Sequence, residues 1–375
     1  MDDAGSPVAG RGSLGEVASA FLKLGVIGFG GPAAHIALMR REFVEERHWL
    51  DEDRFLELFG AANLIPGPAS TELGMMLGYL RAGWAGLLVA GACFIAPAMT
   101  IVLILASIYV RYGSVPATGW VLAGVAPVMI AIIADALWQL GRRALKTLPL
   151  AGVGIAVLLL YLLGVYPIVL LFGGALLVML GRQAGKLRGH ATFLLPVGAA
   201  TVPLRSIFFE FLKLGAIVYG SGYVLLAFLR SDVVQHLHWL SDGHLVDAVA
   251  IGQVTPGPVF TTATFIGYLL AGVPGAITAT VAIFLPSFVF AGVVYSLLPR
   301  LRRSAWAAAF LDGVTVCGLG LMAGVSIQLG RIAITGVLTA ALALAAFVIL
   351  RRYQPNSAWL VLGGALIGLA ARGWG

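Results

Sequence analysis

The chain has 375 residues, of which 60% are apolar and only 11% carry a charge. Soluble domains have about 25% charged residues, so this composition excludes a water-soluble globular protein and indicates one embedded in a membrane. The formal net charge of +7 does not indicate a nucleic-acid partner. The Lys and Arg residues fall mostly in short segments between apolar runs, where such residues fix the orientation of a chain in the bilayer.

The start of the chain shows no signal peptide. The first 16 residues carry Asp2, Asp3 and Glu16 against Arg11. They lack the basic start and the short apolar core of a secretory leader. We therefore expect residues 1–13 to form an N-terminal tail that precedes the first apolar segment.

The first predicted element is an apolar segment from Leu14 to Met39 with a break at Gly28-Phe-Gly-Gly-Pro32. Proline lacks an amide hydrogen and clashes with the preceding turn, so the segment cannot be one regular helix. Lys23 lies inside it, and a charge at such depth costs about 2.5–3.5 kcal/mol on insertion scales. Attraction of a ligand is one hypothesis for Lys23, and snorkelling of its long stem towards an interface is the other.

A second break follows at Pro66-Gly-Pro68, between a short amphipathic helix from Asp51 and another short helix to about Arg81. Each piece has about 12–15 residues, and at about 1.5 Å per residue neither crosses an apolar layer about 30 Å thick. We predict a re-entrant hairpin here, with a pair of tilted short spans as the alternative. Four longer spans are then expected at 84–110, 116–140, 149–163 and 167–181.

The second half of the chain repeats the first. Phe21-Leu-Lys-Leu-Gly25 recurs as Phe211-Leu-Lys-Leu-Gly215, and Pro66-Gly-Pro68 recurs as Pro256-Gly-Pro258, both 190 positions later. Several matched blocks in the same order indicate a duplicated unit. We predict a first transmembrane repeat over 14–190, a linker over 191–202 and a second transmembrane repeat over 203–375.

The basic loops indicate that the two repeats have opposite orientations. In the first repeat, Lys and Arg follow the first segment and the third long span, whereas in the second they gather at Arg300, Arg302 and Arg303 and at Arg351 and Arg352. Since basic loops mark the cytoplasmic side, we expect one half to be inverted, with five crossings and one re-entrant hairpin in each. The predicted fold is an all-α polytopic membrane protein with two inverted-topology repeats and broken helices, the architecture of secondary transporters.

The broken helices predict a binding site for an anion. A helix that restarts after proline points unpaired amides and a positive dipole end into the membrane interior, where an anion is a natural partner. Buried lysines and carboxamides would add donors, and hydroxyls at the helix start either complete the shell or cap the helix. Kinks needed only for packing are the alternative. The predicted substrate-binding residues are Lys23, Gly30, Gly31, Pro32, His35, Asn63, Pro66, Gly67, Pro68, Ser70, Thr71, Lys213, Gln253, Pro256, Gly257 and Pro258.

Two intramembrane carboxylates, Glu72 and Asp135, have no acidic counterpart in the other half. Either is a candidate to carry a coupling proton. The alternative is a pair with a buried cation such as Arg81, to which we assign a role in gating or charge pairing. His35 is a further candidate as proton carrier. Glu210 lies three residues before Lys213, so a simple ion pair is the alternative to a ligand role for that lysine.

The sequence predicts no metal site and no cofactor. Three histidines of the second half, at 236, 238 and 244, share a polar loop without cysteine or a carboxylate-rich shell. No nucleophile elbow, phosphate loop or dinucleotide fingerprint occurs in the strand context that such motifs require, so we do not expect an enzyme. The expected partners are an oxyanion, protons and the lipid bilayer, with no nucleic acid; a homodimer stays open.

Five sequence blocks resemble the chromate ion transporter family. They are Phe-Leu-Lys-Leu-Gly at 21–25, Gly-Gly-Pro-Ala-Ala-His-Ile at 30–36, Glu-Arg-His-Trp-Leu at 46–50, Pro-Gly-Pro-Ala-Ser at 66–70 and Arg-Ala-Gly at 81–83. The resemblance covers nearly the whole chain, in the two-domain long form of the family. It implies a multi-pass protein of the prokaryotic cytoplasmic (inner) membrane that exports chromate, driven by the proton-motive force, with sulfate as a related oxyanion.

The second half departs from the family pattern. It has Gly220-Ser-Gly222 where the first half has Gly-Gly-Pro, and Leu225 where the first half has His35. We therefore expect the two halves to contribute unequally to the site. A transporter of sulfate or another oxyanion is the alternative function, and a membrane-embedded enzyme is the alternative from a different class.

Overall fold

The computed structural model describes residues 12–112, 116–145, 147–182, 203–219, 222–301 and 305–371. Every regular element within these ranges is a helix, so the all-α prediction is confirmed for them. The predicted linker over 191–202 and residues 1–11 of the predicted tail lie outside the described residues.

The helices of the first half follow the predicted order. They are α1 (Leu14–Ile27), α2 (Gly31–Arg40), the π-helical turn η1 (Arg41–Glu46), α3 (Glu52–Ala62), α4 (Ala69–Tyr112), α5 (Pro116–Ala144), α6 (Leu148–Leu162), the π-helical turn η2 (Val169–Gly173) and α7 (Gly174–Arg182). The helices of the second half are α8 (Leu204–Ile217), α9 (Val224–Leu229), the π-helical turn η3 (Arg230–His236), α10 (Asp242–Val254), the short 3-10 helix η4 (Val259–Thr261), α11 (Thr262–Leu301), α12 (Ala305–Ala333), α13 (Val337–Tyr353) and α14 (Ser357–Ala370).

Both predicted breaks of the first half are present. Helix α1 ends one residue before Gly28, and α4 begins directly after Pro68. Helix α4 also bends at Gly83, where φ is 62°, and α11 bends in the same way at Gly272, where φ is 61°. Because a positive φ suits glycine, each bend falls at the position where the sequence separates a short helix from a long span.

Four helical stretches within the described residues are long and apolar enough to cross a membrane, at Ala69–Tyr112, Gly119–Arg142, Val259–Ser296 and Ala309–Ala333. They confirm a polytopic membrane protein. Three shorter apolar helices, at Leu148–Leu162, Val169–Gly181 and Ser357–Ala370, are below the roughly 20 residues that a straight crossing needs. Five crossings in each half therefore stay a prediction.

The duplication extends to backbone details. His48 and His238 both have a left-handed backbone, with φ of 50° and 49°. An arginine before each of these turns pairs with the start of the following helix: Arg40 with Glu52 at 2.8 Å, and Arg230 with Asp242 at 2.7 Å. Equivalent sequences thus fold into equivalent local structures in the two halves.

Two compact units make up the chain, and each unit contains segments from both halves. One unit comprises Met1–Ser107, Phe208–Gly222 and Ile251–Pro299, and the other comprises Ile108–Ile207, Tyr223–Ala250 and Arg300–Gly375. The predicted division at 14–190 and 203–375 describes the duplication, whereas the compact units combine corresponding parts of the two copies.

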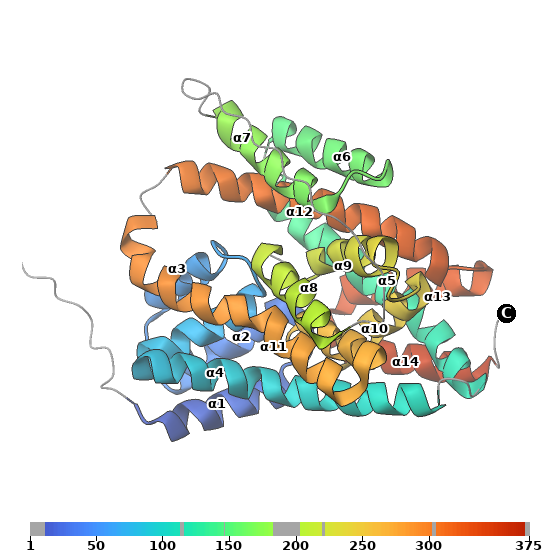
Figure 1. The fold of residues 1–375 in the computed structure, drawn as a ribbon, viewed down its shortest axis with the longest axis horizontal. Coiled ribbons are helices and arrows are strands. Elements are labelled where there is room, and N and C mark those ends of the chain that lie inside the picture. The colour runs from blue at the N-terminus through green and yellow to red at the C-terminus, as the bar shows by residue number, and fades with distance from the viewer. Residues whose placement is uncertain are drawn as a thin grey trace, which may run out of the picture. The chain divides into compact units, whose positions relative to one another are not determined.

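In the second of these units the two halves interlock. Helix α5 of the first half packs against α13 and α14 of the second, while α12, the counterpart of α5, packs against α6 and α7 of the first half (Figure 1). Small residues allow the close approach: a Cβ on Gly124 of α5 would lie 2.0 Å from the carbonyl oxygen of Gly364 in α14. Such contacts between small residues are typical of helix packing in membranes.

The first unit contains both Pro-Gly-Pro turns, and the halves also interlock there. The amide of Gly67 donates to the carbonyl of Val218, just after α8, at 2.6 Å. The amide of Gly257 donates to the carbonyl of Gly28, just after α1, at 2.8 Å. Each turn of one half is therefore bonded to the broken first segment of the other half, at equivalent positions.

Candidate functional site

The carboxyl group of Glu72 packs against the first Pro-Gly-Pro turn. Residues 66–68 are buried, and Gly67 has a φ of +129°. A Cβ on Gly67 would lie 2.0 Å from Oε1 of Glu72 and 2.4 Å from Oγ of Ser287. Glycine is therefore required at position 67 for two reasons: the backbone conformation suits glycine, and the side chains of Glu72 and Ser287 fill the space that a Cβ would occupy.

The start of α4 holds polar atoms that have no partner among the described residues. The amides of Thr71 and Glu72 bond to the carbonyl of Pro68 at 2.7 and 3.2 Å, but those of Ala69 and Ser70 have no hydrogen bond to any described residue. Oγ1 of Thr71 and Oε2 of Glu72 are also buried without a partner within the described part of the chain. Since a helix start carries a partial positive charge and free amides, this arrangement suits an anion.

His35 joins the first break to the start of α4. Its Nε2 lies 2.8 Å from the carbonyl oxygen of Gly28, and its Nδ1 lies 3.2 Å from Oγ of Ser70. A carbonyl only accepts, so Nε2 carries the proton and the Ser70 hydroxyl donates to Nδ1. The ring also meets the edge of Phe94, with 5.3 Å between centroids. Both nitrogens of His35 thus bond to protein groups, Nε2 to the first break and Nδ1 to the start of α4.

The second Pro-Gly-Pro turn has a less polar environment. A Cβ on Gly257 would lie 2.7 Å from the methyl group of Ala98, the sequence counterpart of Ser287. Thr261 and Thr262 stand where the first half has Glu72, and their hydroxyls donate to the carbonyls of Pro258 and Val259. The two helix starts therefore differ: the hydroxyls of Thr261 and Thr262 are bonded to backbone, whereas Thr71 and Glu72 each keep a buried side-chain atom without a described partner.

Asn63 and Gln253 occupy equivalent positions in the sequence but different environments. Asn63 is exposed, and its amide nitrogen donates to the carbonyl of Phe59 at 2.7 Å. Gln253 is buried, with an exposed fraction of 6%. The two carboxamides therefore lie in unlike environments, and a role of both as donors to a ligand stays a prediction.

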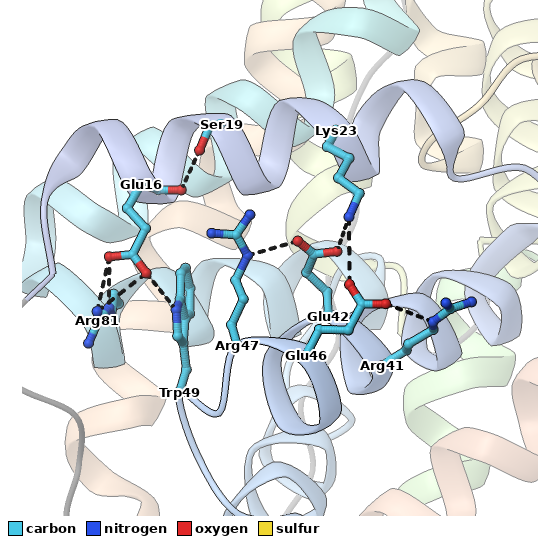
Figure 2. Close-up of polar contacts among 9 residues, drawn as sticks. All are labelled: Glu16, Ser19, Lys23, Arg41, Glu42, Glu46, Arg47, Trp49 and Arg81. Carbon is cyan, nitrogen blue, oxygen red and sulfur yellow. Dashed lines mark hydrogen bonds and ion pairs between the residues drawn. The ribbon is translucent and has the colours of Figure 1, made fainter.

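Lys23 and Lys213 both pair with carboxylates. Lys23 extends from α1 towards Glu42 and Glu46 of η1, with Nζ to oxygen distances of 2.5 and 3.8 Å (Figure 2). Lys213 pairs with Glu210 at 2.7 Å.

Gly30, Gly31 and Pro32 form the turn that starts α2, with φ of 104° at Gly30.

Glu42 is the buried centre of this charge cluster. Its side chain also accepts a hydrogen bond from Nε of Arg47 at 2.8 Å. Burial by itself raises the pKa of the Glu42 carboxyl, but the hydrogen bonds and charges of Lys23 and Arg47 outweigh it, so the pKa lies below the usual value. Glu42 therefore stays ionised at neutral pH, and its charge is balanced by the two cations.

A mutant cycle separates the two hypotheses for Lys23. If Lys23 serves only to neutralise Glu42, Lys23→Met should reduce the amount of folded protein and the double variant Lys23→Met/Glu42→Gln should restore it, because loss of one of its two cations leaves the buried Glu42 charge less well compensated. Oxyanion flux per folded molecule should then be near wild type in the double variant. Flux that stays lost in the restored protein would instead assign Lys23 to the ligand.

Arg81 pairs with a residue of α1. It lies 3.0 Å from Glu16 and over the ring of Trp49, whose indole nitrogen donates to the same carboxylate at 2.8 Å (Figure 2). A pair between Glu72 and Arg81, one alternative from the sequence, is not formed. The prediction of charge pairing for Arg81 agrees with this geometry.

Asp135 has a different environment from Glu72. On α5 it accepts from Nε2 of Gln139 at 2.6 Å and lies 3.5 Å from Arg351 of α13. Its charge is thus balanced by a cation inside its own unit. Of the two candidate proton carriers, Glu72 is the one whose negative charge has no cation beside it, since it forms no ion pair with a described residue.

Sequence reasoning missed Ser287, which donates to Oε1 of Glu72 at 3.1 Å. The signal was present in the repeat: Ser287 follows Pro286 in α11, whereas Ala98 follows Pro97 at the equivalent point of α4. A hydroxyl that replaces a methyl group in one copy marks a polar position. No group of three or more His, Cys, Asp or Glu side chains that could hold a metal ion occurs in the described ranges.

Comparison with known proteins identifies the family. The sequence model described as "Chromate transporter" matches the chain twice, over residues 15–179 and 205–369. The chain belongs to the chromate transporter family. The two matches place the broken helices and the Pro-Gly-Pro turn within each copy of this family's sequence.

Named relatives agree with the assignment to the chromate transporter family. The chain is 35% identical to a chromate transport protein of Cupriavidus metallidurans, over 96% of this chain and 93% of the relative. It is 34% identical to a probable chromate transport protein of Synechococcus elongatus, over 85% of each chain. It is 31% identical to a chromate transport protein of Pseudomonas aeruginosa, over 85% of this chain and 82% of that protein. No solved structure matches the chain.

Proposed function

We propose that this protein exports chromate across the cytoplasmic membrane, driven by the proton-motive force. The family supports a role in chromate transport. The observation that carries the choice of site is the start of α4, where two free amides and the buried hydroxyl of Thr71 have no partner in the described part of the protein. A chromate dianion has four acceptor oxygens and would satisfy these donors.

The proposed site combines elements from both halves. The turn at 66–68 and the start of α4 supply the donors, Ser287 of α11 supports Glu72, and His35 holds Ser70 and the first break in place. The remaining breaks, at Gly30–Pro32 and Pro256–Pro258, shape the backbone around it. We further propose that the two halves have inverted topology, the arrangement with which secondary transporters expose a site to each side of the membrane in turn.

Sulfate transport is the second candidate, and one observation favours it. The donors at the start of α4 are amides and hydroxyls, which recognise tetrahedral geometry and negative charge and not the central atom. Chromate, sulfate and molybdate dianions share these properties. A measurement of the direction of transport would show whether the protein exports the oxyanion or takes it up.

A flux assay in proteoliposomes tests the proposal. With a controlled pH gradient and membrane potential, we expect saturable chromate flux, with sulfate and molybdate as competitors. Thr71→Val keeps the shape of the side chain but removes a donor to a charged ligand, a bond worth about 1.5–3 kcal/mol, so the half-saturating chromate concentration should rise about tenfold or more. Thr315→Val, which removes an exposed hydroxyl on α12, is the matched control.

Three outcomes would contradict parts of the proposal. Liposomes in which correctly folded protein gives no oxyanion flux would exclude transport of this class. Accumulation of chromate by right-side-out vesicles, and not by everted ones, would reverse the proposed direction. Equal kinetics for Thr71→Val and Thr315→Val would remove the start of α4 from the site.

A further inference from the structure

Glu72 lies in an environment that does not suit an ionised carboxylate. Its side chain has an exposed fraction of 0% and reaches back over the turn at Gly67. Oε1 accepts one hydrogen bond, from Ser287 at 3.1 Å, and Oε2 has no partner among the described residues. A buried carboxylate that lacks a cation and most of its hydrogen bonds is strongly disfavoured relative to the neutral acid.

The groups around Glu72 include no balancing cation. From its own helix come Ser70 and Thr71, from α11 comes Ser287, and from the segment after α8 comes Tyr219, the titratable group in electrostatic contact with Glu72. From the first break comes His35, whose nitrogens are engaged by Gly28 and Ser70. These groups carry no formal positive charge, so only the Ser287 hydrogen bond and the partial charge of the helix start favour the ionised form of Glu72 in its described surroundings.

The contact with Ser287 distinguishes the two oxygens of Glu72. With Ser287 donating to Oε1, the proton of the neutral acid lies on Oε2, the oxygen that no described residue contacts by a hydrogen bond. The Oε2 hydroxyl then joins the amides of Ala69 and Ser70 and the Thr71 hydroxyl at the same end of α4. All four groups can donate, and of the four the Thr71 hydroxyl can also accept a hydrogen bond.

We propose that protonated Glu72 determines the specificity of the site, by making it select oxyanions that carry no proton of their own. This inference rests on the proposed function and deepens it. A fully deprotonated tetrahedral dianion, such as sulfate, molybdate or chromate, accepts at every oxygen and pairs with every donor. Phosphate keeps a hydroxyl at neutral pH, and that hydroxyl meets a set of donors among which only the Thr71 oxygen can also accept. A mismatch of this kind between donors disfavours phosphate relative to the fully deprotonated dianions.

The proposal also fixes how binding depends on pH. The complex contains one proton, on the Glu72 carboxyl, for each bound dianion. Loss of the Glu72 proton places a negative charge beside the ligand and removes one hydrogen-bond donor. Binding of the dianion and deprotonation of Glu72 therefore exclude each other. Above the pH at which Glu72 ionises, affinity for the dianion should fall about tenfold per pH unit.

Equilibrium binding of radiolabelled sulfate to the detergent-solubilised full-length protein tests this inference. Wild type should bind sulfate with constant affinity at lower pH and lose affinity at alkaline pH, and molybdate should compete at least 100-fold better than phosphate. Glu72→Gln replaces the acid by an amide whose nitrogen donates from the position of Oε2. It should keep sulfate affinity within about threefold of the low-pH wild-type value and lose the pH dependence. Glu45→Gln, at an exposed ion pair, should keep the wild-type profile.

A second variant tests the inference even if Glu72→Gln does not fold. Ser287→Ala removes the one hydrogen bond that a described residue gives to the ionised form of Glu72, so affinity should fall at a higher pH than in wild type. A wild-type profile that is flat over the whole range, or equal competition by phosphate and molybdate, would overturn the inference while leaving oxyanion transport intact. Absence of any oxyanion binding to folded protein would overturn the proposed function as well.

Discussion

Gly67→Ala should abolish oxyanion flux and strongly destabilise the protein. Alanine at a φ of +129° is strained, and a residue held in such a region costs about 1–3 kcal/mol. Its methyl group would also lie 2.0 Å from Oε1 of Glu72 and 2.4 Å from Oγ of Ser287, and overpacking of this kind costs about 1–3 kcal/mol more. The displaced carboxyl could no longer occupy its place at the start of α4, so the effect should reach the site directly.

Two other glycines separate these causes. Gly83→Ala introduces strain at a φ of 62° but meets nothing within 4 Å, and Gly60→Ala, inside α3, meets neither strain nor contact. We expect thermal unfolding in detergent to give the order Gly60→Ala, Gly83→Ala, Gly67→Ala from most to least stable, with flux lost in the last. A Gly67→Ala protein that unfolds and transports like wild type would show that the turn and the carboxyl are not packed as described.

Gly124→Ala should separate α5 from α14. The new methyl group would lie 2.0 Å from the carbonyl oxygen of Gly364 and 2.9 Å from Cα of Gly368. Both are backbone atoms, which cannot move aside by a rotamer change. The expected loss is at least the roughly 1–3 kcal/mol typical of overpacking, seen as a lower unfolding temperature and less protein in the membrane.

Gly119→Ala is the matched control for this prediction. Gly119 lies in the same helix and a methyl group there meets nothing within 4 Å, so this change removes only the helix penalty of glycine, about 0.8–1.0 kcal/mol. Both variants should be measured by size-exclusion chromatography after heating. Equal unfolding temperatures for the two variants would rule out a close crossing of α5 and α14 at Gly124.

Local breaks could be predicted from the sequence because they depend on nearest neighbours. Pro32, Pro66 and Pro68 cannot continue a helix, and α1, α3 and α4 end or begin within a few residues of them. The duplication could be predicted for a similar reason, since equivalent peptides such as those at His48 and His238 adopt the same unusual backbone. The orientation of the repeats and the number of crossings stay predictions.

The partners of the site residues could not be predicted in the same way. Glu72 meets Ser287, which is 215 residues away in the chain, and only the packing of α4 against α11 brings them together. Asn63 and Gln253 have equivalent positions in the sequence, yet one is exposed and the other buried. Lys23 was predicted from its depth alone, without the carboxylates of η1 that its long side chain reaches. Long-range contacts, and not local propensity, decide these environments.

The exchange of partners between the halves has a consequence for biogenesis. A ribosome delivers α5 to the membrane long before α13 and α14, against which it packs, have been synthesised. The nascent first half therefore inserts with glycine-lined surfaces uncovered, and its final arrangement waits for translation of the C-terminal helices. Premature termination within the second half would leave α5 without its neighbours, so truncated products should be substrates for membrane proteases and not smaller working transporters.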